Sequence, residues 1–177
     1  MNSVRYGKKT ILSRSLVCFL SVWFMMFASE ASFSDQTDIR LKGLFKDLKA
    51  ASLDVDALVA ERKIWKIWTT HKNRHITSLM SQGLKALDNN NLEKGLGLFN
   101  NIIDMDPNFA EAWNKRATIY FLMRNFDKSM QDIRQTLILE PRHFGAISGL
   151  GLIFNALGQP ENALSAFRRV REIYPLS

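Results

Sequence analysis

Three of the four prolines in this chain, Pro107, Pro141 and Pro175, follow one another at intervals of 34 residues. A constant interval of this length is typical of proteins built from stacked helical hairpins, with one hairpin in each repeat. No repeat of this kind buries its own apolar face, so each one needs a neighbour to pack against. Such a stack carries no built-in chemistry, and its usual product is a concave surface that holds another protein.

The residues ahead of each proline recur at the same interval. With proline placed at position 32, the repeats span residues 76–109, 110–143 and 144–177. Apolar residues dominate positions 4, 11, 24 and 27, which predicts one buried face on each of two helices. Positions 8 and 20 are small, which lets the two helix axes approach. The small residues are Gly83, Ala117 and Gly151 at position 8, and Gly95, Ser129 and Ala163 at position 20.

The repeats also carry turn signals. Asn89–Asn91, Arg124–Asn125 and Gly158–Gln159 fall where the hairpins are expected to reverse. Proline at position 32 cannot continue the second helix, so it directs the chain into the next repeat.

These residues resemble the tetratricopeptide repeat (TPR) family, most closely over residues 110–141. The resemblance implies an all-α, right-handed α-solenoid of three TPR hairpins over residues 76–175. It also implies a non-catalytic protein that binds other proteins. Position 7, usually apolar in this family, is Gln82 and Arg116 in the first two repeats. The packing expected at that position is therefore weaker.

Residues 1–31 differ from the rest of the chain. Four basic residues precede an apolar run from Leu16 to Ala28, and small residues stand before an expected cleavage after Ala31. This pattern predicts a secretory signal peptide and a periplasmic protein. The run is shorter than the roughly 20 apolar residues that a spanning helix needs. The alternative is an uncleaved helix that anchors the chain in the inner membrane, and membrane contact is expected only in that case.

In the remainder of the chain no nucleophile–base pair, paired carboxylate or metal cluster indicates an enzyme, and the charge does not indicate a nucleic-acid binder. Residues 1–31 hold four of the 24 basic and one of the 17 acidic residues, which leaves a mild net charge of +4. Domains that bind nucleic acid usually show a strongly basic face. The only cysteine, Cys18, lies in the predicted signal peptide, so no thiolate metal site is expected. We expect no catalytic residue, no metal and no cofactor.

The histidines do not indicate a metal site either. His71 and His75 are four residues apart, as in some zinc sites, but Lys72 and Arg74 lie between them. Those cations oppose a metal, so a solvated turn is expected there.

Two segments precede the first full repeat. Residues 32–38 are polar and are expected to form a flexible linker. Residues 39–70 show helical spacing but lack the small residue and the proline of a repeat. They are predicted to form a degenerate helical hairpin that caps the stack. Trp65 and Trp68 are expected to fill the interface between this hairpin and the first full repeat.

The last helix, predicted over residues 160–174, is expected to bury one apolar face. Its members are Ala163, Leu164, Phe167, Val170 and Ile173. If the polar face of this helix does not cap the stack, the exposed end favours self-association. A structural subunit of a larger complex or a homo-oligomer is therefore a second interpretation of the chain.

The family resemblance also implies which side chains line the concave groove. They are Met80, Leu84 and Leu87 from the first repeat, Glu111, Asn114, Thr118, Phe121 and Leu122 from the second, and Ser148, Gly149 and Leu152 from the third. This largely apolar surface suits an amphipathic helix or an extended hydrophobic peptide. Gly145 and Gly149 leave a notch in its floor, which either a ligand or the chain's own N-terminal segment approaches closely.

The leading interpretation is thus an adaptor in the bacterial envelope that binds a peptide or helix of another protein.

Overall fold

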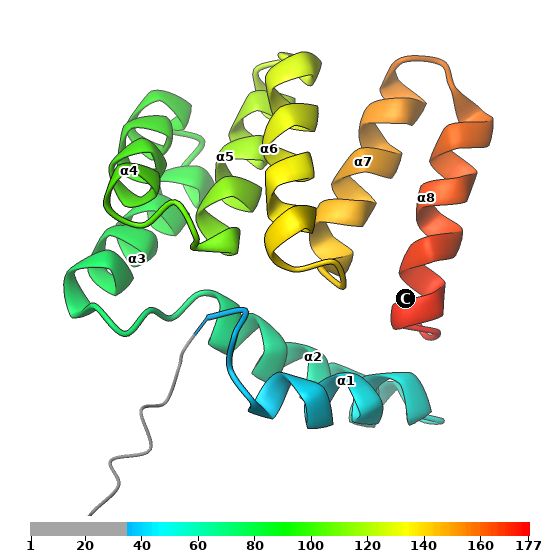
Figure 1. The fold of residues 1–177 in the computed structure, drawn as a ribbon. Coiled ribbons are helices and arrows are strands. Elements are labelled where there is room, and N and C mark those ends of the chain that lie inside the picture. Colours follow the sequence, from blue (N-terminus) through cyan, green and yellow to red (C-terminus); the bar gives the residue numbers. More distant parts are fainter. Residues whose placement is uncertain (1–34) are drawn as a thin grey trace, which may run out of the picture. The chain divides into compact units, whose positions relative to one another are not determined.

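The computed structural model of this protein describes residues 35–177, and every regular element in that range is an α-helix (Figure 1). These residues belong to one compact unit. The predicted signal peptide, residues 1–31, and the first part of the predicted linker lie outside the described residues. None of the described helices is long and apolar enough to span a membrane.

Six of the helices form three consecutive hairpins. The hairpins pair α3 (Arg74–Asp88) with α4 (Leu92–Met105), α5 (Ala110–Leu122) with α6 (Phe126–Leu139), and α7 (Phe144–Ala156) with α8 (Pro160–Ile173). Helix α4 packs on α5 and α6 packs on α7, so the hairpins stand side by side in chain order (Figure 1). The predicted all-α solenoid of helical hairpins is confirmed.

The small residues at positions 8 and 20 allow the two helices of a hairpin to approach. A Cβ atom on Gly83 would lie 2.7 Å from the ring of Phe99, at position 24 of the same repeat. In the second repeat the hydroxyl of Ser129 donates a hydrogen bond of 2.7 Å to the carbonyl oxygen of Ala117. Larger side chains at either position would push the helices apart.

The hairpins reverse where the turn signals predict. One residue in each turn has a left-handed backbone conformation: Asn90 (φ 55°), Arg124 (φ 58°) and Gly158 (φ 71°). In the first two turns an asparagine follows and caps the next helix. Asn91 accepts the N–H of Lys94, and Asn125 accepts the N–H of Lys128, each at 3.2 Å.

Arg116, the polar residue at position 7 of the second repeat, has specific polar partners. Its Nε and Nη2 donate to the two carboxylate oxygens of Asp132 at 2.7 and 2.8 Å. Its Nη1 donates to Asn100 in the preceding repeat at 2.9 Å. A bidentate ion pair within the second repeat therefore replaces the usual apolar contact, and the hydrogen bond to Asn100 links this repeat to the first.

The helices α1 (Arg40–Ala50) and α2 (Asp54–Trp68) form a fourth hairpin, as predicted, but it lies elsewhere in the fold. Its buried apolar face packs against the third repeat. The shared cluster contains Leu41, Leu48, Ile64 and Trp68 from the hairpin, and Phe144, Ile147, Val170 and Tyr174 from the repeat. The prediction that Trp65 and Trp68 fill the interface with the first full repeat is therefore wrong. Position 8 of this hairpin is Lys49 rather than the small residue of a full repeat. Its aromatic side chains pack against Phe144 of the third repeat instead.

The outer face of α8 also differs from the prediction. Ala163 and Val170 are buried as expected, but Leu164 is 50 % exposed and Phe167 is 38 % exposed. In the first two repeats the next hairpin covers this face. No helix follows α8 among the described residues, so its outer face lacks that cover.

Candidate functional site

The α1–α2 hairpin and the residues that flank it contact each of the three proline turns, which we define as residues 106–109, 140–143 and 174–177. Residues flanking the hairpin bind the first turn, the tryptophans of α2 contact the second, and Glu61 of α2 binds the third. The three proline turns, which recur once in each repeat, are therefore the sites at which the N-terminal hairpin and its flanking residues contact the repeats.

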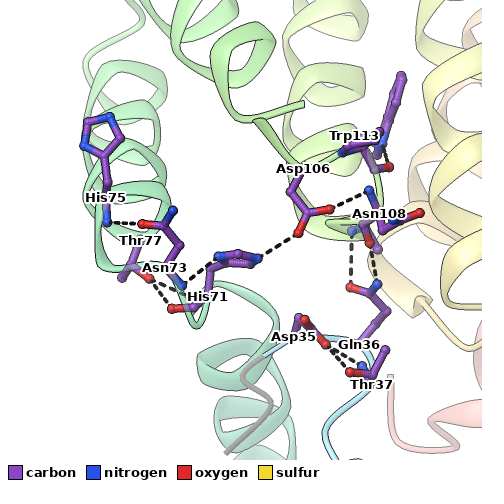
Figure 2. A network of polar contacts seen from close by, with 12 residues as sticks. Asp35, Gln36, Thr37, His71, Asn73, His75, Thr77, Asp106, Asn108 and Trp113 are labelled. Carbon is purple, nitrogen blue, oxygen red and sulfur yellow. Dashed lines mark hydrogen bonds and ion pairs between the residues drawn. The ribbon is translucent and has the colours of Figure 1, made fainter. Parts of the chain in front are cut away.

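The first turn is bound by the segment before α1 (Figure 2). The side chain of Gln36 donates to the carbonyl oxygen of Asn108 and accepts the N–H of Ala110 at 3.2 Å. Asp38, two residues further on, is buried and ion-paired with Arg40. Gln36 of the predicted flexible linker is therefore attached to the repeats, because its side chain satisfies main-chain groups of Asn108 and Ala110.

His71, between α2 and α3, also binds the first turn (Figure 2). Its Nε2 lies 3.0 Å from the carboxylate of Asp106, and its ring packs against Phe109. Its Nδ1 accepts the N–H of Asn73 at 3.0 Å. His71 is buried, so the predicted solvated turn is wrong at this residue, whereas His75 is exposed.

At the second turn, His143 joins the hairpin to the repeats. Its Nδ1 accepts the N–H of Ala146 at 3.1 Å and caps α7. The proton must then be on Nε2, which donates to Glu111 at 2.8 Å. The indole of Trp68 stacks on the imidazole, with ring centroids 4.0 Å apart and planes inclined by 11°. His143 is thus fully enclosed.

Glu111 is the buried acid of this cluster. Its carboxylate accepts a hydrogen bond of 3.1 Å from Asn114 and lies 3.0 Å from the ammonium group of Lys115. Burial alone would raise the pKa of Glu111, but Lys115 and His143 outweigh it and lower the pKa from 4.5 to about 2. The prediction that Glu111 lines an accessible groove is wrong, because these partners enclose it.

Gly145 faces the hairpin. A Cβ atom there would lie 2.6 Å from Cη2 of Trp65, a separation that requires one of the groups to move. The ammonium group of Lys115 lies 4.8 Å from the centroid of the same indole. The chain's own N-terminal segment, one of the two alternatives that the sequence left open, is therefore what approaches Gly145.

Glu61 connects the second turn to the third. One of its carboxylate oxygens accepts the indole N–H of Trp65 at 3.1 Å, and the other accepts the hydroxyl of Tyr174 at 3.1 Å. Burial and the nearby Glu61 raise the pKa of Tyr174, which keeps the phenol protonated as the donor.

Gly149 faces a pocket of about 160 Å³ between α5 and α7, with further lining from α6. Six of the eleven predicted groove residues line it: Asn114, Thr118, Phe121, Ser148, Gly149 and Leu152. No side chain of α1 or α2 belongs to its lining. A Cβ atom on Gly149 would meet only Cδ1 of Ile133, at 3.4 Å. Gly145 lines the same pocket, so the two glycines of the predicted notch share it, but only Gly145 is approached by Trp65 of α2.

The other predicted groove residues lie outside this pocket. Met80 is fully buried in the cluster shared by the first two repeats, so its prediction as an accessible groove residue is wrong. Leu84 borders a separate pocket with Thr69, and Leu87 is half-buried. Leu122 is exposed at the end of α5. Within residues 35–177, no three His, Cys, Asp or Glu side chains are placed to hold a metal ion.

Comparisons with known proteins agree with this architecture. A family model described as tetratricopeptide repeat matches residues 98–131. A TPR repeat-containing protein of Rhizobium etli is 37% identical over 136 residues, which cover 77% of this chain and 67% of that protein. The small glutamine-rich tetratricopeptide repeat-containing protein 2 of Saccharomyces cerevisiae is 30% identical over 95 residues, 54% of this chain and 28% of that protein.

The fold has a counterpart among solved structures. The crystal structure of MamA superimposes with a TM-score of 0.52 at 20% identity, over 75% of this chain and 77% of that one. Together with the three in-phase hairpins and the similarity to the Rhizobium protein, these findings show that this chain belongs to the tetratricopeptide repeat family.

Proposed function

We propose that this chain is an adaptor that binds an apolar peptide or helix of another protein at the pocket between α5 and α7. Proteins of the tetratricopeptide repeat family generally mediate protein–protein interactions and typically act as non-catalytic scaffolds. The observation that carries the proposal is the pocket itself, because Trp65 of the N-terminal hairpin approaches it only at Gly145, and no side chain of α1 or α2 lines it.

The lining of the pocket suits an apolar anchor. Phe121, Ile133 and Leu152 supply apolar walls, and Thr118 and Ser148 add polar groups that can orient a ligand main chain. The volume of about 160 Å³ is several times the ~30 Å³ share of one water molecule. The pocket therefore has room for one large side chain, while the rest of a ligand would lie along α5 and α7.

Filling the pocket from within should abolish binding. We expect Gly149→Leu to remove partner binding with little loss of thermal stability, because leucine favours the helix by up to about 1 kcal/mol over glycine. The assay places a photo-crosslinking amino acid at Leu152 in intact cells and follows the adduct by gel and mass spectrometry.

The matched control is Gly97→Leu on α4, where a Cβ atom would meet nothing within 4 Å. The control should keep the Leu152 adduct that Gly149→Leu loses. An adduct of equal yield in both variants would remove the pocket from the binding surface.

The proposed site of action is the bacterial envelope. The support is the basic, apolar and small-residue pattern of residues 1–31. We expect the periplasmic fraction to contain a chain that begins at Ser32, as read by N-terminal sequencing, and Ala31→Phe to leave a longer, membrane-bound chain. A full-length wild-type chain in the membrane fraction would instead support the anchored alternative, and one in the cytoplasm would refute both.

A further inference from the structure

The outer face of α8 corresponds to the faces of α4 and α6 that the following hairpin covers. Position 24 of the repeat is Phe99, Ile133 and Phe167 in the three repeats. Phe99 and Ile133 are 0% and 3% exposed, whereas Phe167 is 38% exposed. At position 21, Leu96 and Met130 are partly buried, while Leu164 is exposed. The third repeat therefore presents a stacking face whose equivalents in the first two repeats are covered.

We infer that this face of α8 packs antiparallel against the same face of a second copy of the chain. Glu161, Leu164, Arg168 and Arg171 follow one another at helical spacing and share one side of α8. The acidic group is at the start of the helix and the basic groups are near its end. An antiparallel pair places Glu161 opposite the partner's Arg171, so the face is complementary to itself in that orientation alone.

A head-to-tail stack of copies fits the surfaces less well. The opposite end of the array is α3, whose exposed residues are all polar or charged, including Ser78, Gln82 and Lys85. Stacking α8 on that face would bury Leu164 and Phe167 against polar side chains without partners. A two-fold contact brings the same patch of both copies together and closes the assembly at two.

A second exposed apolar patch provides the natural comparison. Val55, Leu58 and Val59 of α2 are also exposed, and they lie outside the three repeats. This patch is the control surface.

Pairing through α8 would also present two α5–α7 pockets in one assembly, which raises the avidity for a partner with two binding segments.

Cysteine crosslinking of the full chain in intact cells tests the pairing. The single natural cysteine is first removed as Cys18→Ser. Ser165→Cys then places a thiol beside the α8 face without changing its apolar residues, and Leu58→Cys places one on α2. A short bismaleimide is expected to join two copies through residue 165 and not through residue 58. Crosslinking through residue 58 alone, no species of twice the chain's mass, or a residue 165 adduct to a different protein would each overturn the inference.

Charge reversal provides a second readout that does not depend on the buried contacts of Phe167. In the Ser165→Cys background, Glu161→Arg or Arg171→Glu alone should lower the yield of linked dimer about fivefold or more, because each change acts twice in a symmetric pair. The two changes together should restore the yield, since the opposite charges then face one another again. A double variant that stays as low as the single ones would show that the antiparallel pairing is wrong.

Discussion

Trp68→Ala is expected to lower the free energy of unfolding by about 3–5 kcal/mol, the usual loss when a buried aromatic side chain is removed from a core. Trp68 is 1% exposed and stacks on His143, and its ring also packs with Phe45 and Phe144. Its removal would leave a cavity at the junction of the N-terminal hairpin with the third repeat. Urea unfolding followed by circular dichroism at 222 nm measures the loss.

Two further variants sharpen this experiment. The indole Nε1 of Trp68 is buried without a hydrogen-bond partner, a condition that costs about 1–3 kcal/mol. Trp68→Phe removes that cost while keeping a ring, so it should be far less destabilising than Trp68→Ala. Leu58→Ala, on the exposed side of the same helix, should change stability by no more than about 0.5 kcal/mol. Equal stability of Trp68→Ala and Leu58→Ala would show that the hairpin does not pack as described.

Glu111→Gln is expected to destabilise the chain by about 3 kcal/mol near neutral pH, with the difference from wild type vanishing in acid. The pKa of Glu111 in the folded chain is about 2, against 4.5 for an ordinary glutamate, so the unfolded chain binds the proton more tightly. The contribution of Glu111 is therefore complete above about pH 4.5 and is lost as the pH falls toward 2. A shift of this size corresponds to about 3 kcal/mol at ~1.4 kcal/mol for each pH unit.

The measurement is the free energy of unfolding of both proteins between about pH 2 and pH 7. The wild-type curve should fall more steeply than that of Glu111→Gln below about pH 4.5, until the two meet. Glu172→Gln, which removes an exposed carboxylate near the end of α8, is the control substitution. Parallel curves for Glu111→Gln would mean that the buried carboxylate does not titrate as its partners indicate.

The repeats could be predicted from sequence because their determinants are local and recur. Proline ends the second helix, small residues set the distance between helices, and a left-handed residue reverses each hairpin. Each of these features acts within a few residues of its position and appears three times in phase. The three hairpins, their turns and the close approach at Gly83 follow from them directly.

The placement of the N-terminal hairpin could not be predicted in this way. Its partners lie as many as 113 residues away, and nothing in its own spacing identifies them. The spacing of Trp65 and Trp68 predicted a buried aromatic face but not the surface that buries it. The sequence feature that could have indicated the docking surface is Gly145. A glycine inside a helix lowers its stability, and a close neighbour such as Trp65 explains why a larger residue is absent there.

The polar cluster was missed for a different reason. Glu111 and Lys115 look like ordinary surface residues of a helix, and His143 looks like a loop residue. They are brought together because His143 caps α7 in the turn where the hairpin docks. Glu111 and Met80 were expected in the groove for the same reason, since position within a repeat does not show what else packs on it.

The bond between Glu61 and Tyr174 has a consequence for how the chain acquires its structure. An array whose units touch only their neighbours can add them one at a time, as each emerges from the ribosome. Here α1 and α2 gain most of their docking surface only when α7 and α8 exist. Early collapse of the N-terminal segment onto itself would leave its tryptophans in water, so the completed molecule should assemble late and in one cooperative step.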